Sequence, residues 1–206
     1  MIARHSARGR ERGVTLVVVL VLLIAAAFLG VSAAVIALQT EKASRGDRDR
    51  QIAFQAAEAA LIDAQRDIDT AGTSPNARQL TMAADTALGF PPTEQTILCP
   101  ASPPRDPGHG LCRRPIDGAQ SSWPKDTDLS DASISVEYGQ FTGQQFPGPK
   151  AGLPARPPRY VIELMPYVQP GHNVQTQSFA YRISAIGFGT SADTQVVLQA
   201  FYRKEQ

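Results

Sequence analysis

The longest hydrophobic segment of the chain begins near the N-terminus, and no charged side chain occurs between Arg12 and Glu41. An α-helix over residues 14–38 would be about 37 Å long, which exceeds the roughly 30 Å hydrocarbon core of a bilayer. A secretory signal peptide has a shorter apolar region of about 7 to 15 residues, followed by small residues at its cleavage site. The pattern therefore predicts a transmembrane helix over residues 14–38.

From Gln39 onward the same helix is expected to continue with an amphipathic pattern. Its apolar positions recur at spacings of three and four residues, which places them on one stripe of a helix. This packing face consists of Phe54, Ala57, Leu61, Ala64 and Ile68. Gly72, followed by Thr-Ser-Pro, is typical of a helix C-terminus. We expect one long helix over residues 14–71, with a membrane half (14–38) and an amphipathic half (39–71) that packs on a globular domain.

The remainder of the chain predicts strands and loops. All 16 prolines lie between Pro75 and Pro170, so residues 73–130 and 140–158 are expected to be connections, with one short helix at 80–88. Alternating or β-rich patterns predict strands at residues 133–138, 160–165, 179–186 and 194–203. Sequential strands without helices between them favour an antiparallel sheet. The expected fold class is therefore α+β, with a head over residues 72–206.

Residues 1–13 form a short basic leader that ends in a glycine. Its charged side chains are Arg4, Arg8, Arg10, Glu11 and Arg12. A basic leader that ends in Gly directly before an apolar helix resembles the processing site of type IV prepilins. The resemblance implies that a prepilin peptidase cleaves after Gly13 and methylates the new N-terminal residue, Val14. The family usually carries a glutamate at the fifth mature position, which is Val18 in this chain.

The segment after the apolar run strengthens this resemblance. Residues 48–61, with the string FQAAEAAL, resemble the corresponding segment of PilX-type minor pilins. The resemblance implies a pilin-like head and a minor pilin that helps to initiate type IV pilus assembly. The implied partners are other minor pilins, the major pilin, the prepilin peptidase and the inner membrane. The implied location is the inner membrane with a periplasmic head before assembly, and the pilus at the cell surface afterwards.

The valine at the fifth mature position motivates a hypothesis about place in the filament. In the family, the glutamate there is thought to offset the N-terminal amine of a neighbouring subunit. An uncompensated charge inside an apolar helix bundle is costly, and Val18 has no carboxylate to compensate it. A subunit without this carboxylate suits a filament tip, where one axial neighbour is absent, better than the shaft.

Two alternative functions remain open on the sequence. A minor pseudopilin of a type II secretion system has the same leader, helix and head. A signal-anchored periplasmic binding protein or adhesin would instead recognise a ligand through loops such as residues 141–158, and it predicts no cleavage at Gly13.

Composition and chemistry favour a structural protein without a cofactor. Loss of the leader leaves 16 basic and 18 acidic side chains, with no basic patch that would indicate nucleic-acid binding. His109 and His172 lie near glycines and have no nucleophile motif beside them. The acidic residues Asp126, Asp128 and Asp131 lack the central glycine and distal glutamate of a calcium loop. We therefore expect neither enzymatic activity nor a bound metal.

The two cysteines, Cys99 and Cys112, lie in a loop rich in proline and glycine. A disulfide that closes 14 residues contributes roughly 3 kcal/mol in the chain-entropy model, and we expect one here. Because disulfides persist in oxidising compartments, it would place the head outside the cytoplasm. Two free thiols, or a metal site that recruits His109 and His172, are the alternatives, although two cysteines at this spacing do not supply the four ligands of a zinc site.

Overall fold

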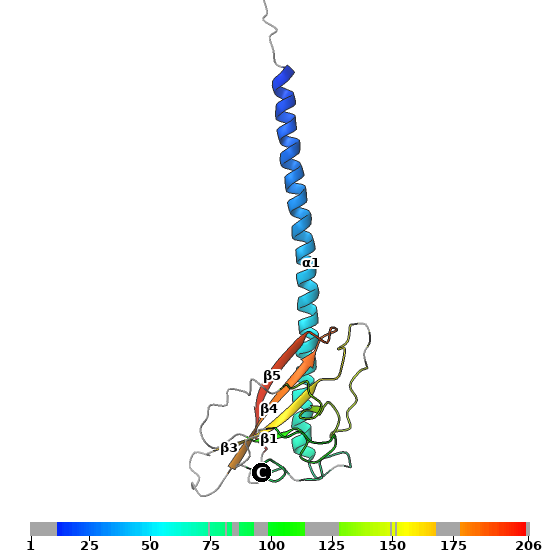
Figure 1. The fold of residues 1–206 in the computed structure, drawn as a ribbon, viewed down its shortest axis with the longest axis vertical. Coiled ribbons are helices and arrows are strands. Elements are labelled where there is room, and N and C mark those ends of the chain that lie inside the picture. The colour runs from blue at the N-terminus through cyan, green and yellow to red at the C-terminus, as the bar shows by residue number, and fades with distance from the viewer. Residues whose placement is uncertain are drawn as a thin grey trace, which may run out of the picture. The chain divides into compact units, whose positions relative to one another are not determined.

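The computed structural model describes residues 12–73, 75–80, 82–83, 87–92, 99–113, 128–148, 150, 152–167 and 178–204. The chain divides into two units, Met1–Asp47 and Arg48–Gln206. Helix α1, Arg12–Thr70, begins in the first unit and ends in the second (Figure 1). His172, Asp126 and most of the leader lie outside the described residues.

The C-terminus of α1 is formed by the residues that the sequence indicated. Gly72 adopts a φ of 75°, a left-handed conformation that glycine reaches without a Cβ penalty. The Gly72 amide donates to the Arg78 carbonyl (2.8 Å), and the Thr73 amide donates to the Thr70 carbonyl (2.9 Å). The chain therefore turns back after α1, and residues 75–80 return beside its last turn.

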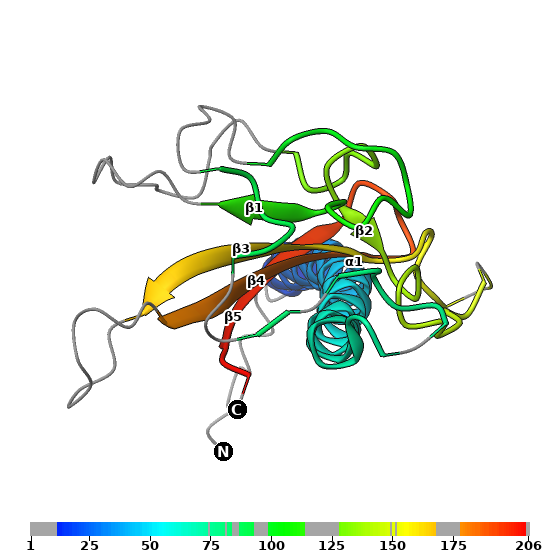
Figure 2. The same cartoon turned by 90° about the horizontal axis from the view of Figure 1, so that it is seen from below.

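Among its described residues, the second unit forms a sheet of five strands: β1 (Leu111–Arg113), β2 (Val136–Glu137), β3 (Arg159–Tyr167), β4 (Ser178–Phe188) and β5 (Gln195–Tyr202). The path of neighbouring strands is β1-β3-β4-β5, and β2 also pairs with β3 (Figure 2). Strands β3, β4 and β5 are antiparallel to one another, with Tyr160 opposite Ala185 and Ala185 opposite Leu198. The α+β fold class is confirmed, with a long helix on a sheet.

The sheet differs from the expected antiparallel one at its β1 edge. Strand β1 pairs in parallel with β3, with Leu111 opposite Ile162, and it lies in a segment that the prolines predicted to be a connection. The strand predicted at residues 133–138 is reduced to β2. Its first half forms a turn in which the Asp131 side chain accepts from the Ser133 amide (2.8 Å) and the Asp131 carbonyl accepts from the Ser135 amide (3.2 Å). Local side-chain bonding of this kind competes with strand pairing.

The short helix predicted at residues 80–88 is not seen in the part of it that the structure describes. Leu80, Met82, Ala83, Ala87 and Leu88 have no helical conformation. Leu80 and Met82 are instead buried in the core as parts of an irregular segment.

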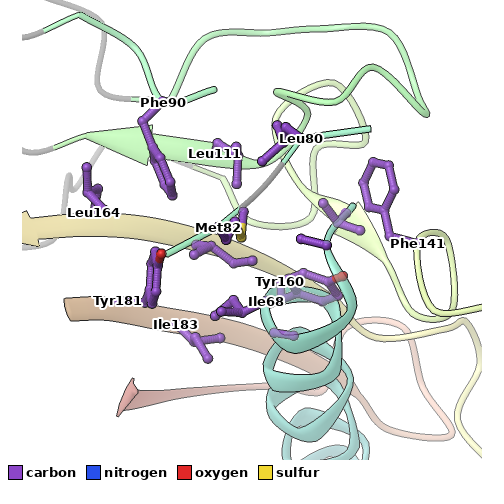
Figure 3. Close-up of a cluster of buried hydrophobic side chains, with 14 of the residues drawn as sticks. Ile68, Leu80, Met82, Phe90, Leu111, Phe141, Tyr160, Leu164, Tyr181 and Ile183 are labelled. Carbon is purple, nitrogen blue, oxygen red and sulfur yellow. The ribbon is translucent and has the colours of Figure 1, made fainter. Parts of the chain in front are cut away.

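The main core lies between the last part of α1 and one face of the sheet (Figure 3). Ala60, Ala64 and Ile68 on the helix pack with alternate residues of β3 and β4, among them Tyr160, Ile162, Leu164, Tyr181, Ile183 and Ala185. Of the predicted packing face, Ala57, Ala64 and Ile68 are fully buried, Leu61 is half-buried, and Phe54 is 42% exposed. The buried stripe is thus rotated away from Phe54, towards small residues such as Ala53 and Ala60.

Candidate assembly helix and head anchor

The first unit presents an apolar helical surface. The described side chains from Val14 to Leu38 are all exposed, and Val18 is 51% exposed. By length and composition, α1 is long and apolar enough to cross a membrane. Such a surface is stable only in lipid or against other apolar helices.

Close backbone contact fixes α1 on the sheet in the second unit. A Cβ built on Gly187 of β4 would collide with the backbone at Ala53, Ala56 and Ala57. The absence of a Cβ on the strand residue allows the two backbones to approach in this way. The strand predicted at residues 179–186 ends before Gly187, whereas β4 continues to Phe188, so this contact was not expected.

Polar contacts hold the β4–β5 hairpin to α1 at both of its ends. The Asp49 carboxylate accepts from the amide and the hydroxyl of Thr190, both at 2.5 Å. These bonds to the Thr190 side chain and backbone lower the pKa of Asp49. At the other end the Tyr202 hydroxyl donates to Asp69 (2.6 Å), and the Lys204 amine donates to the carbonyls of Ile68 (3.0 Å) and Asp69 (3.2 Å). A cation at these carbonyls also complements the helix dipole.

A buried ion pair joins α1 to the segment that follows it. The Arg78 Nε donates to both oxygens of Asp67 (2.9 and 2.8 Å), and both side chains are fully buried. The Tyr160 hydroxyl also donates to Asp67 (2.8 Å). The Arg78 Nη1 donates to the carbonyls of Pro107 and His109, at 2.8 and 2.6 Å. Burial raises the pKa of Asp67, and the charge of Arg78 opposes that shift.

A second buried carboxylate lies one turn earlier on the same side of α1. Asp63 accepts from the Gly139 amide (2.7 Å) and from the Thr142 hydroxyl. Burial raises its pKa, while the bonds from Gly139 and Thr142 act in the opposite direction. Asp63 therefore ties the helix to the turn after β2, a role that hydrophobic periodicity does not indicate.

His109 is buried in this network. Its Nε2 lies 3.0 Å from the Ser135 carbonyl, an acceptor, so Nε2 carries the proton, and its Nδ1 accepts from the Ser102 hydroxyl at 3.1 Å. Burial lowers the pKa of His109, and the nearby charges of Arg78 and Arg159 lower it further. Both ring nitrogens thus take part in the packing of residues 99–113.

Acid is expected to destabilise the head through His109. Below a pH of about 6.5 the unfolded chain takes up a proton at this histidine that the folded chain does not, so folding weakens as the pH falls towards the lowered pKa. Asp63 and Asp67, whose pKa values are raised, act in the opposite direction when they gain protons. The test compares thermal unfolding at pH 7 and pH 5 for the wild type and His109→Gln. The variant should lose less stability between the two pH values, and an equal loss in both proteins would contradict this role.

A disulfide joins Cys99 and Cys112, with Cα atoms 4.4 Å apart. Cys112 belongs to a second buried cluster with Leu129, Val161, Ile186 and Phe188. Residues 161 and 186 alternate with those that face α1, so this cluster covers the opposite face of the sheet. The bond therefore anchors residues 99–113 to that face.

Loss of this disulfide is expected to lower the free energy of unfolding by roughly 3 kcal/mol, because the bond closes a loop of about 14 residues. The measurement is denaturant unfolding of the full chain in detergent, with Cys99→Ser/Cys112→Ser compared with the wild type. A reductant should shift the wild type to the same midpoint and leave the double variant unchanged. Equal midpoints for both proteins without reductant would contradict the prediction.

No group of three or more His, Cys, Asp or Glu side chains able to hold a metal occurs among the described residues. Among the candidate calcium ligands, Asp128 and Asp131 lie in the described part of the chain. The Asp128 carboxylate accepts from the Ser130 amide, and the Asp131 carboxylate accepts from the Ser133 amide (both 2.8 Å). Both carboxylates thus serve the loop itself.

Comparison with protein families covers almost the whole described chain. Residues 12–61 match the family described as PilX N-terminal, and residues 70–204 match the family described as type IV pilus assembly protein PilX C-term. No curated protein matches the chain, and no solved structure does so.

Proposed function

The chain belongs to the PilX family of type IV pilus proteins and is of the minor-pilin class, and from this premise we propose that it primes pilus assembly at the filament tip, together with other minor pilins. The observation that carries the proposal is the exposed apolar half of α1. Once out of the bilayer, this surface needs the helices of other pilins around it. The protein thus acts as a structural component and not as an enzyme.

Processing at the N-terminus belongs to the same proposal. A prepilin peptidase cleaves after Gly13 and methylates Val14, which removes the basic leader and leaves an apolar end for packing. The head lies in the periplasm before assembly, in keeping with the disulfide between Cys99 and Cys112. The assembled protein contacts other minor pilins and the major pilin.

The tip position rests on Val18. No carboxylate is present at this fifth mature position to offset the amine of an adjacent subunit, and an unpaired charge in an apolar bundle is costly. A tip subunit lacks one axial neighbour and so avoids part of this cost. In this proposal the protein therefore occupies the end of the filament.

The test uses an antibody to the head on purified filaments, viewed by electron microscopy. Label confined to filament ends is the expected result, whereas regular label along the shaft would exclude the tip position. In parallel, deletion of the gene should reduce surface filaments strongly, and the wild-type gene should restore them. Unchanged filament numbers after deletion would exclude the priming role.

A further inference from the structure

We infer that the free edge of β5 is a docking site for an extended, uncharged segment of another protein of the filament. Within the described part of the chain, β5 pairs with β4 on one side only and lies at the edge of the sheet (Figure 2). A sheet edge presents unpaired backbone donors and acceptors at strand spacing, which only another extended chain can match along its length.

The register identifies which residues face outward. The Gly189 amide donates to the Thr194 carbonyl at 2.8 Å, and the same pairing continues without a bulge to Tyr181 opposite Tyr202. In an antiparallel pair, hydrogen-bonded and non-bonded positions alternate. Even-numbered residues of β5 therefore bond to β4, and the amides and carbonyls of the others point to the free edge. These outward residues are Gln195, Val197, Gln199 and Phe201.

This edge lacks the features that normally prevent strand pairing. Edge strands are usually protected by charged side chains, proline, a bulge or short length. Strand β5 spans eight residues, QVVLQAFY, with no charge and no proline. Two of its outward residues carry exposed apolar side chains, since Val197 is 48% and Phe201 is 70% exposed. An incoming strand would cover both.

The edge is also held rigidly before any partner arrives. Asp49 bonds the hairpin loop at Thr190, and Tyr202 and Lys204 bond the last turn of α1 at the other end of the strand. Because both ends are fixed to the helix, the strand pays little ordering entropy when another strand pairs with it. This distinguishes β5 from a loose terminal strand.

The occupant follows from charge and symmetry. Strand β5 has no charged side chain that could form an ion pair with an incoming strand. The incoming strand is therefore uncharged, with apolar side chains opposite Val197 and Phe201. A second copy of this chain fits poorly. Antiparallel pairing of two β5 strands needs a two-fold axis normal to the sheet, which reverses α1 in one copy, whereas copies anchored in one membrane by α1 run in the same direction.

The inference rests on the proposed function, since it places the partner in the same filament. The experiment replaces Phe201 with the photo-crosslinking residue p-benzoylphenylalanine in the full chain, expressed in its native host. Filaments are purified, irradiated and analysed by mass spectrometry. The expected product is a cross-link to one contiguous, uncharged segment of another pilus protein.

A matched pair of second substitutions tests whether the contact uses the edge backbone. Gln199→Pro removes one outward amide without removing a bond to β4 and should reduce the cross-link at least tenfold, whereas Gln199→Thr should retain it. Val197→Lys, compared with Val197→Thr, gives the same test through charge if the proline variant does not fold.

Three results would overturn the inference: no cross-link in filaments that contain the protein, a cross-link to a second copy, or a yield that neither Gln199→Pro nor Val197→Lys lowers. Filaments that lack the protein altogether would contradict the proposed function, and this inference with it. The two failures are therefore distinguishable.

Discussion

Replacement of Arg78 with methionine is expected to lower the free energy of unfolding of the head by about 3 to 5 kcal/mol. The change leaves the Asp67 carboxylate buried without its cation, and the carbonyls of Pro107 and His109 lose a donor. Natural domains are stable by only about 5 to 15 kcal/mol, so this loss is a large part of the total. Near-UV circular dichroism during denaturant unfolding in detergent follows the buried Tyr160 and Tyr181 directly.

A double-mutant cycle separates the coupling free energy of the Asp67–Arg78 ion pair from the cost of lost packing. Asp67→Asn alone leaves the Arg78 charge buried and should also be strongly destabilising, whereas Asp67→Asn/Arg78→Met removes both charges and should cost less than the sum of the two. Glu137→Gln is the control, because Glu137 is half exposed where it pairs with Arg159, and it should cost about 1 kcal/mol or less. Additive effects of the Asp67 and Arg78 changes would show that the pair is not coupled.

Replacement of Gly187 with valine is expected to cost about 3 kcal/mol, because the new side chain must displace the helix backbone at Ala53 and Ala57. Intrinsic strand propensity predicts the opposite sign, since valine is favoured over glycine in a strand. The result therefore decides between local preference and the close contact with α1.

The control for this variant is Gly148→Val, at a glycine whose added Cβ meets no atom within 4 Å. It should change the unfolding midpoint little. Hydrogen exchange gives a local reading, because lifting α1 from β4 should speed exchange in residues 53–60 of the Gly187 variant alone. A stabilised Gly187→Val protein would refute the proposed backbone contact.

The long helix and strands β3, β4 and β5 could be predicted from sequence because their periodic patterns extend over many residues. The end of α1 could be predicted because Gly72 supplies the left-handed conformation that closes a helix. The disulfide between Cys99 and Cys112 is present in the structure, as expected for two cysteines in a loop rich in proline and glycine.

Strand β1 could not be predicted because it has only three residues and depends on a parallel partner about 50 residues further along the chain. The buried face of α1 was misplaced at Phe54 because periodicity gives weight to large side chains, whereas the helix approaches β4 through alanines. A signal was present in Asp63 and Asp67, which lie four residues apart among Ala60, Ala64 and Ile68. Carboxylates on that side of a helix indicate buried polar partners.

In the proposed function, the apolar half of α1 enters a filament after the charged leader has been removed. The most direct test is the mass of the N-terminal peptide of the protein purified from its native host. The expected result is a chain that begins at Val14 and carries one added methyl group on its amine. A chain that still begins at Met1, with its leader intact, would contradict it.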